Sequence, residues 1–153
     1  MGVEMNNNPR LVPSTANLSS GDLVAVYGTL RKGQSNNAGT GLSENAEYLG
    51  STTVKGVLFS LGGFPGLVQE YEGVEPAAVV VDVYELKNDK IGRRLDSLEG
   101  YSPDREYNDF YTRMLVQDRA GQDMHIYYYM GDVSMRRLIE SGDWVEHRNK
   151  MYT

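Results

Sequence analysis

The sequence predicts an α+β fold whose strand-rich part curls into a small barrel. Three observations predict this class. The chain of 153 residues is 40% hydrophobic, which suffices for one core but not comfortably for two. Most of its apolar segments have the length and composition of strands, whereas two segments have helical spacing. These two helices are interposed among the strands, and no internal repeat is visible.

Composition excludes several classes of function. The formal net charge of -6 gives no electrostatic basis for binding nucleic acid or an anionic membrane surface. The absence of cysteine removes disulfides, thiolate nucleophiles and cysteine metal ligands. No apolar stretch approaches the roughly 18 residues of a membrane span, and no secretion signal is visible, so we expect a cytoplasmic protein. The oligomeric state stays open.

The first segment with a strand pattern begins near residue 22. Residues 1–20 are rich in Asn, Ser and Pro and show no periodicity, so we expect a disordered arm followed by one domain at 21–153. The apolar run Leu23 to Tyr27 predicts a strand buried on both faces. The following stretch, Arg31 to Gly41, is predicted to be a loop.

The middle of the chain predicts further strands. Ala46 to Leu61 alternates around Gly50 and Gly56, as two short strands or one strand kinked at glycine would. Gly62 to Gly66 is predicted to be a turn or loop. Ala77 to Leu86 contains three consecutive valines and is predicted to be a strand.

A helix is predicted next, capped by Asn88 or Asp89 and ended by Gly100. One face of this helix carries apolar residues at spacings of four and three, namely Ile91, Leu95 and Leu98. Glu99 therefore lies at a helix C-terminus. There the helix dipole and partial burial would both raise the pKa of its carboxyl toward that of a useful base and acid.

The last third predicts two strands and a helix. Tyr111 to Gln117 and Met124 to Met130 have strand patterns and are joined by a polar turn. A short helix is predicted at Ser134 to Glu140.

The end of the first strand is a candidate anion site. Gly28 can adopt a positive φ, so the N–H groups of Thr29, Leu30 and Arg31 can converge on a carboxylate or on a carbonyl oxygen that gains charge. The alternative is an ordinary strand-ending turn. The Arg31 side chain is equally consistent with neutralising a carboxylate and with being a surface charge.

Five motifs in order resemble the gamma-glutamylcyclotransferase-like family, in particular its gamma-glutamylamine cyclotransferase and AIG2-like branch. They cover the chain from about Leu23 to Trp144. The motifs are Tyr27-Gly28-Thr29-Leu30-Arg31, Phe64-Pro65-Gly66-Leu67-Val68, Leu95-Asp96-Ser97-Leu98-Glu99-Gly100, Tyr111-Thr112-Arg113 and Ser141-Gly142-Asp143-Trp144. The resemblance implies a compact mixed β-barrel flanked by short helices, with the glycine loop and Glu99 in one cavity. It also implies release of 5-oxoproline from a gamma-glutamyl compound without metal or cofactor.

The chemistry is consistent with a chain that has no cysteine. The α-amine of a gamma-glutamyl amide can close a five-membered ring on the γ-carbonyl, so the substrate brings its own nucleophile. One carboxylate must accept the amine proton and deliver a proton to the leaving amine. Glu99 is the candidate, and its alternative role is a solvated residue that ends a surface helix. A different class of function, a module that binds a small anionic metabolite without turnover, stays open.

Further tyrosine and arginine side chains are candidates for the substrate site. Tyr27 is expected to line the cavity or to fill the barrel. Tyr111 and Arg113 match the family's tyrosine and arginine and share a strand face, where they would border the pocket or pack in the barrel wall. Tyr129 would present its hydroxyl to the ligand or be a half-buried core tyrosine. The sequence does not choose among gamma-glutamyl-lysine, a polyamine conjugate, a gamma-glutamyl amino acid and a modified natural product.

Overall fold

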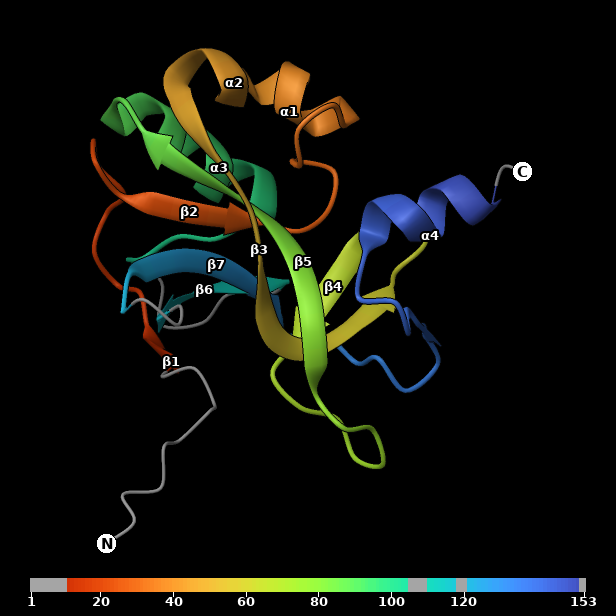
Figure 1. Cartoon of the computed structure of the whole chain (residues 1–153). Helices are drawn as coiled ribbons and strands as arrows, with labels where there is room; N and C mark the ends of the chain where they lie inside the picture. The colour runs from red at the N-terminus through yellow and green to blue at the C-terminus, as the bar shows by residue number, and fades with distance from the viewer. Residues whose placement is uncertain (1–10, 105–109, 118–120, 152–153) are drawn as a thin grey trace, which may run out of the picture.

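A computed structural model describes residues 11–104, 110–117 and 121–151 (Figure 1). In this part of the chain the strands are β1 (Leu11–Pro13), β2 (Leu23–Val26), β3 (Ala46–Ser60), β4 (Pro65–Val68), β5 (Ala77–Leu86), β6 (Tyr111–Gln117), β7 (Asp123–Tyr129) and β8 (Arg137–Leu138). They form one sheet in the order β1-β6-β7-β2-β5-β3-β4, and β8 also pairs with β3. The β2–β7 pair is parallel, and the other pairs are antiparallel.

The sheet curls back on itself. Its long strands β3 and β5 lie side by side and curve away from β2 toward the opposite end of the molecule (Figure 1). This curvature brings β4 next to β7. The two strands are so close that a Cβ atom added to Gly66 of β4 would lie 3.0 Å from the Cβ atom of Tyr129 in β7. The predicted α+β class with a curled, barrel-like sheet is therefore confirmed.

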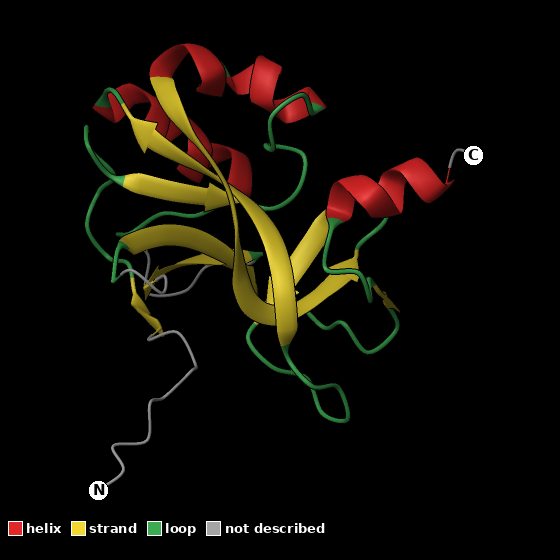
Figure 2. Cartoon of the chain, viewed as in Figure 1, coloured by secondary structure: helices red, strands yellow, loops and turns green. Residues whose placement is uncertain are grey.

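The helices are α1 (Ser35–Thr40), α2 (Leu42–Asn45), α3 (Asp89–Glu99) and α4 (Trp144–Met151). The first three lie together at one end of the sheet, whereas α4 lies apart from them (Figure 2). One core cluster lies on the strands and includes Trp144 of α4, and a second cluster joins the sheet to α2 and α3.

Helix α3 has the predicted bounds. The Asn88 side chain accepts a hydrogen bond from the Ile91 N–H at 3.0 Å, and Gly100 ends the helix with a φ of +66°. Ile91 and Leu95 are fully buried, but Leu98 is 43% exposed. The last residue of the predicted apolar face therefore does not belong to the core.

Strand β3 is continuous, so of the two predicted alternatives the structure has one kinked strand and not two short strands. Its pairing with β5 is interrupted by a bulge between Tyr48 and Gly50, and Gly50 has a φ of +116°. Two segments predicted to be loops are partly regular. Residues 35–40 form α1, and residues 65–68 form β4 because they pair with residues 57–60 of β3.

The helix predicted at Ser134 to Glu140 is wrong. Arg137 and Leu138 pair with β3 instead, so a tertiary contact overrides the local helical preference. The C-terminal helix begins later, at Trp144, where the Asp143 carboxylate accepts hydrogen bonds from two backbone N–H groups of the first turn.

The N-terminal segment differs from the predicted arm at residues 11–20, while residues 1–10 lie outside the described part. Strand β1 pairs with β6, and Leu18 is only 3% exposed. Leu18 rests on Gly92 of α3, where an added Cβ atom would lie 2.6 Å from the leucine Cβ. This segment is held by pairing with the edge of β6 and by packing on Gly92 of α3. Both contacts are tertiary, so the composition of the segment does not predict them.

Candidate active site

A cavity of about 790 Å³ lies where the end of β2, the start of β4 and the C-terminus of α3 meet. It brings together seven of the nine residues that the sequence predicted for a site: Tyr27, Gly28, Thr29, Leu30, Glu99, Tyr111 and Tyr129. Two stretches some seventy positions apart in the sequence thus border one hollow.

Glu99 is half-buried at the C-terminus of α3, and burial raises the pKa of its carboxyl from 4.5 to about 7. In the described part of the chain, no group donates a hydrogen bond to it. The neighbouring phenols are engaged elsewhere: Tyr27 donates to the Tyr127 carbonyl at 2.6 Å, and Tyr111 donates to the Pro65 carbonyl at 3.0 Å. The carboxyl can therefore both accept and release a proton near neutral pH.

Glu99 lines the same cavity as these two phenols. Burial is the largest cause that raises the pKa of Tyr27 and of Tyr111, and the Glu99 charge adds to the increase for both. The phenols therefore remain neutral. They form an uncharged wall of the cavity around one ionisable carboxyl.

Gly28 is required for a reason other than the predicted one. Its φ is not positive. A Cβ atom at this position would lie 2.6 Å from both Cγ and Cδ of Pro65. The absence of a side chain thus lets the end of β2 approach the start of β4, which closes one side of the cavity.

Gly28→Ala is therefore expected to destabilise the protein by about 1–3 kcal/mol, because the new methyl group overpacks against Pro65. Gly39→Ala is the matched control, since an added Cβ atom there has no neighbour within 4 Å. In α1 it should be neutral or stabilising by up to about 1 kcal/mol. Chemical denaturation of both variants measures the difference, and similar changes in the two would contradict the packing argument.

The loop after Gly28 offers fewer amides than predicted. The Arg31 N–H donates to the Gly28 carbonyl at 3.0 Å and closes a turn, so it is not free for a ligand. No acceptor in the described residues engages the N–H groups of Thr29 and Leu30. The Thr29 hydroxyl oxygen accepts a hydrogen bond from the Asn36 side chain at 2.7 Å, which leaves the hydroxyl proton available to donate.

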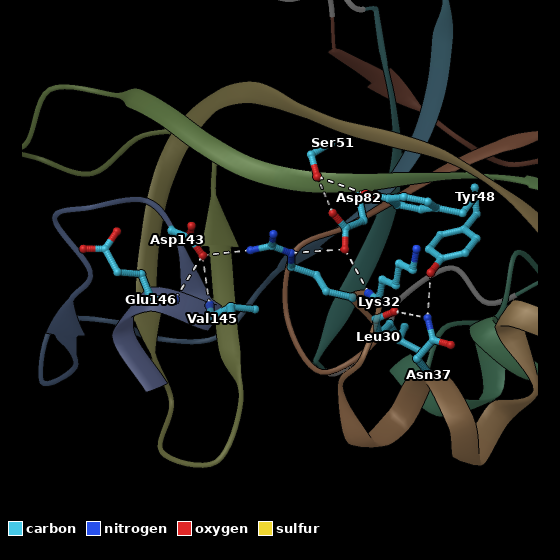
Figure 3. A network of polar contacts seen from close by, with 11 residues as sticks. Leu30, Lys32, Asn37, Tyr48, Ser51, Asp82, Asp143, Val145 and Glu146 are labelled. Atoms are coloured by element: carbon cyan, nitrogen blue, oxygen red, sulfur yellow. Dashed lines mark hydrogen bonds and ion pairs between the residues drawn. The ribbon is translucent and has the colours of Figure 1, made fainter. Parts of the chain in front are cut away.

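The Arg31 side chain does not line the cavity. Its Nε atom lies 3.3 Å from an Asp82 carboxylate oxygen, and an Nη atom lies 2.8 Å from Asp143. Asp82 also accepts a hydrogen bond from the Lys32 N–H at 2.9 Å. Figure 3 shows Asp82 and Asp143 in this network, which ties the loop to β5 and to the start of α4. Arg31 thus fastens the loop after Gly28 to these elements and does not line the cavity.

Arg113 also lies outside the cavity, buried in an ion pair with Asp96 of α3. Asp96 also accepts a hydrogen bond from the Tyr127 hydroxyl at 2.6 Å, and Arg113 donates to the Ser14 hydroxyl at 3.0 Å. These contacts anchor α3 to β6 and β7 less than one turn before Glu99. Asp96 and Arg113 thus hold the end of α3 without lining the cavity, whereas Tyr127 also lines it.

The tyrosines on β6 and β7 form one wall. The rings of Tyr111 and Tyr129 meet edge to face with centroids 5.5 Å apart, and both line the cavity. Several lining residues were missed by the sequence reasoning, including Asn36, Phe64, Leu98, Phe110 and Arg136. They come from separate connections and helix ends. Phe64 and Leu98 belong to two of the family motifs but were not predicted to line the site, and Asn36, Phe110 and Arg136 stand in none of these motifs.

The described residues contain no group of three or more His, Cys, Asp or Glu side chains that could hold a metal ion. His125 lies with its Nδ1 atom 2.6 Å from the Ser14 hydroxyl. No helix in the described ranges is long and apolar enough to cross a membrane.

Comparison with known proteins identifies the family. A model of the family described as gamma-glutamyl cyclotransferase, AIG2-like, matches residues 24–146. The gamma-glutamylcyclotransferase family protein YtfP of Escherichia coli K12 is 33% identical over 124 residues, which cover 80% of this chain and 96% of that protein.

Two solved structures show the same fold. PH0828 from Pyrococcus horikoshii has a TM-score of 0.64 at 23% identity, over 86% of this chain and 96% of its own. Allophanate hydrolase from Kluyveromyces lactis has a TM-score of 0.65 at 17% identity, over 86% of this chain and 22% of its own. Since the family model covers most of the sequence, the chain belongs to the gamma-glutamyl cyclotransferase, AIG2-like family and is an enzyme of the gamma-glutamylcyclotransferase type.

Proposed function

We propose that this enzyme cyclises the gamma-glutamyl part of a small amide, isopeptide or amine conjugate, with Glu99 as general base and then general acid. The observation that carries the proposal is the shared cavity. It combines a half-buried carboxyl whose pKa is about 7 with the N–H groups of Thr29 and Leu30, which no acceptor among the described residues engages. A proton carrier and an anion-binding loop are the two parts that this reaction needs.

In the proposed reaction the Glu99 carboxylate accepts a proton from the substrate α-ammonium. The freed amine attacks the γ-carbonyl carbon, and the new C–N bond closes a five-membered ring. The bond from that carbon to the leaving nitrogen then breaks as Glu99 returns its proton to this nitrogen. The ring nitrogen still carries two hydrogens after the attack, and it gives up the second as a proton to the released amine, which leaves in its protonated form. The products are 5-oxoproline and a free amine, and no water is consumed.

The remaining groups bind and orient the substrate. The amides of Thr29 and Leu30 and the Thr29 hydroxyl would bind the α-carboxylate of the glutamyl part, which fixes the chain in its folded conformer. Tyr27 and Tyr111 would exclude water beside Glu99, because their hydroxyls are already engaged with backbone carbonyls. The proton then passes between carboxyl and substrate rather than to solvent.

The test is to incubate the purified protein with a panel of gamma-glutamyl amines, amino acids and isopeptides and to measure 5-oxoproline. We expect stoichiometric release of 5-oxoproline and amine from at least one compound. Failure of every compound to yield product, although the protein is folded, would overturn the proposal.

The raised pKa of Glu99 predicts a pH dependence. Below about pH 7 the carboxyl of the free enzyme is protonated and cannot act as base, so kcat/KM should rise with pH and level off above about 7. A profile of kcat/KM from pH 5 to pH 8.5 measures the inflection. An inflection near the ordinary glutamate value of about 4.5 would show that Glu99 is not the titrating base.

A further inference from the structure

The cavity is larger than the glutamyl part of the substrate requires. Its volume of about 790 Å³ lies in the upper half of the range of roughly 300–1,000 Å³ that holds drug-sized ligands. A five-membered ring next to Glu99 and Thr29 would leave much of it open. The open part must receive the leaving amine, and its lining therefore decides which amines are accepted.

One cation lines the cavity in the described part of the chain, and it is Arg136. A guanidinium Nη atom of Arg136 lies 3.5 Å from the Leu61 carbonyl, in the turn that also carries Phe64. Among the described residues no carboxylate forms an ion pair with Arg136 within 4.0 Å. Its charge is one of the smaller causes that lower the pKa of the exposed Asp132. Most of its five donors therefore remain available.

Arg136 and Glu99 occupy different parts of the cavity. Glu99 lies at the C-terminus of α3, which forms another side of the cavity. Arg136 instead lies beside the turn between β3 and β4. It is thus placed toward the leaving amine rather than toward the reacting carbon.

We propose that Arg136 binds a carboxylate on the leaving amine, so that the enzyme favours gamma-glutamyl amino acids and peptides over gamma-glutamyl amines without an anion. This inference rests on the proposed function. The glutamyl carboxylate has its own donors at Thr29 and Leu30, so a second anion is what an additional guanidinium would recognise. Phe64 and Phe110 are 47% and 61% exposed at the cavity and suit an apolar amino-acid side chain.

The test compares gamma-glutamyl-alanine with gamma-glutamyl-ethylamide, which differs from it only by lacking the carboxylate. Arg136→Gln should lower kcat/KM for gamma-glutamyl-alanine by about 5- to 20-fold, the range expected of a charged hydrogen bond at a solvent-exposed site. The same variant should change kcat/KM for the ethylamide by less than about twofold, because it loses no partner there. Arg137→Gln, at the next position and outside the cavity lining, is the matched control and should leave both values unchanged.

Two results would overturn the inference and leave the proposed function intact. The first is an equal loss of kcat/KM on both compounds in Arg136→Gln, which would assign Arg136 to binding of the glutamyl half or to folding. The second is no loss of kcat/KM on either compound. If the unaltered protein releases no 5-oxoproline from either compound or from the wider panel, the proposed function fails and this inference fails with it.

Discussion

Glu99→Gln is expected to lower kcat by about 10²- to 10⁴-fold, the contribution typical of a general acid–base group. Glutamine has nearly the shape of glutamate but cannot accept the amine proton or return it to the leaving nitrogen. The loss should appear in kcat, while KM changes little, because the loop proposed to bind the substrate carboxylate is untouched. Release of 5-oxoproline under single-turnover and steady-state conditions measures both parameters, and an unchanged kcat would remove Glu99 from the mechanism.

The same variant supplies its own folding control. Burial raises the pKa of Glu99 in the folded protein, so the folded state favours the protonated carboxyl. The free energy of unfolding therefore falls as the pH rises through about 7 and the buried carboxyl must ionise. Glutamine carries no such cost. Glu99→Gln should therefore be more stable than the unaltered protein by roughly 1–3 kcal/mol at pH 8, after allowance for solvent screening of a half-buried group. The advantage should disappear toward pH 4.5, and thermal denaturation across this range measures it.

Arg113→Met is expected to destabilise the protein by about 3–5 kcal/mol, because it leaves the Asp96 carboxylate in a buried site without its cation. Chemical denaturation of this variant gives the free energy of unfolding. Arg93→Met is the matched control: Arg93 is exposed on α3, and its replacement should change stability by less than about 0.5 kcal/mol.

A double-mutant cycle separates the ion pair from general packing. Asp96→Asn removes the buried charge, so adding it to Arg113→Met should cost much less than the sum of the single variants. Strict additivity would show that the two side chains do not depend on one another. Because α3 carries Glu99 shortly after Asp96, the Arg113 variant should also lower kcat.

The strands and α3 could be predicted because their signals are local. Apolar runs of strand length, the cap at Asn88 and the stop at Gly100 each specify their own element. The segment at residues 134–140 could not be predicted in this way, since its state is decided by pairing with β3. Strand β4 and the N-terminal segment depend on distant partners for the same reason.

Glu99 and the loop after Gly28 could be predicted as parts of the candidate site, whereas several other residues that line the cavity could not. Glu99 and the Gly28 loop each stand at a boundary between secondary-structure elements, where a motif can be recognised. The two arginines that accompany these motifs in the sequence point elsewhere, because acidic side chains distant in sequence, Asp82 and Asp96, bind them. Arg136 reaches the cavity only through the short pairing of β8, and no sequence pattern marks it.

The pairing of β1 with β6 bears on how soluble shortened forms of this chain would be. β1 pairs with residues 114–116 at the outer edge of β6, where backbone amides and carbonyls would otherwise face solvent. A chain trimmed to begin at Gly21 would uncover this edge and the surface of α3 at Gly92. Uncovered edges of this kind recruit strands from other molecules. Such a shortened protein would be prone to self-association even with its cavity intact, so a fusion partner is best attached before Leu11.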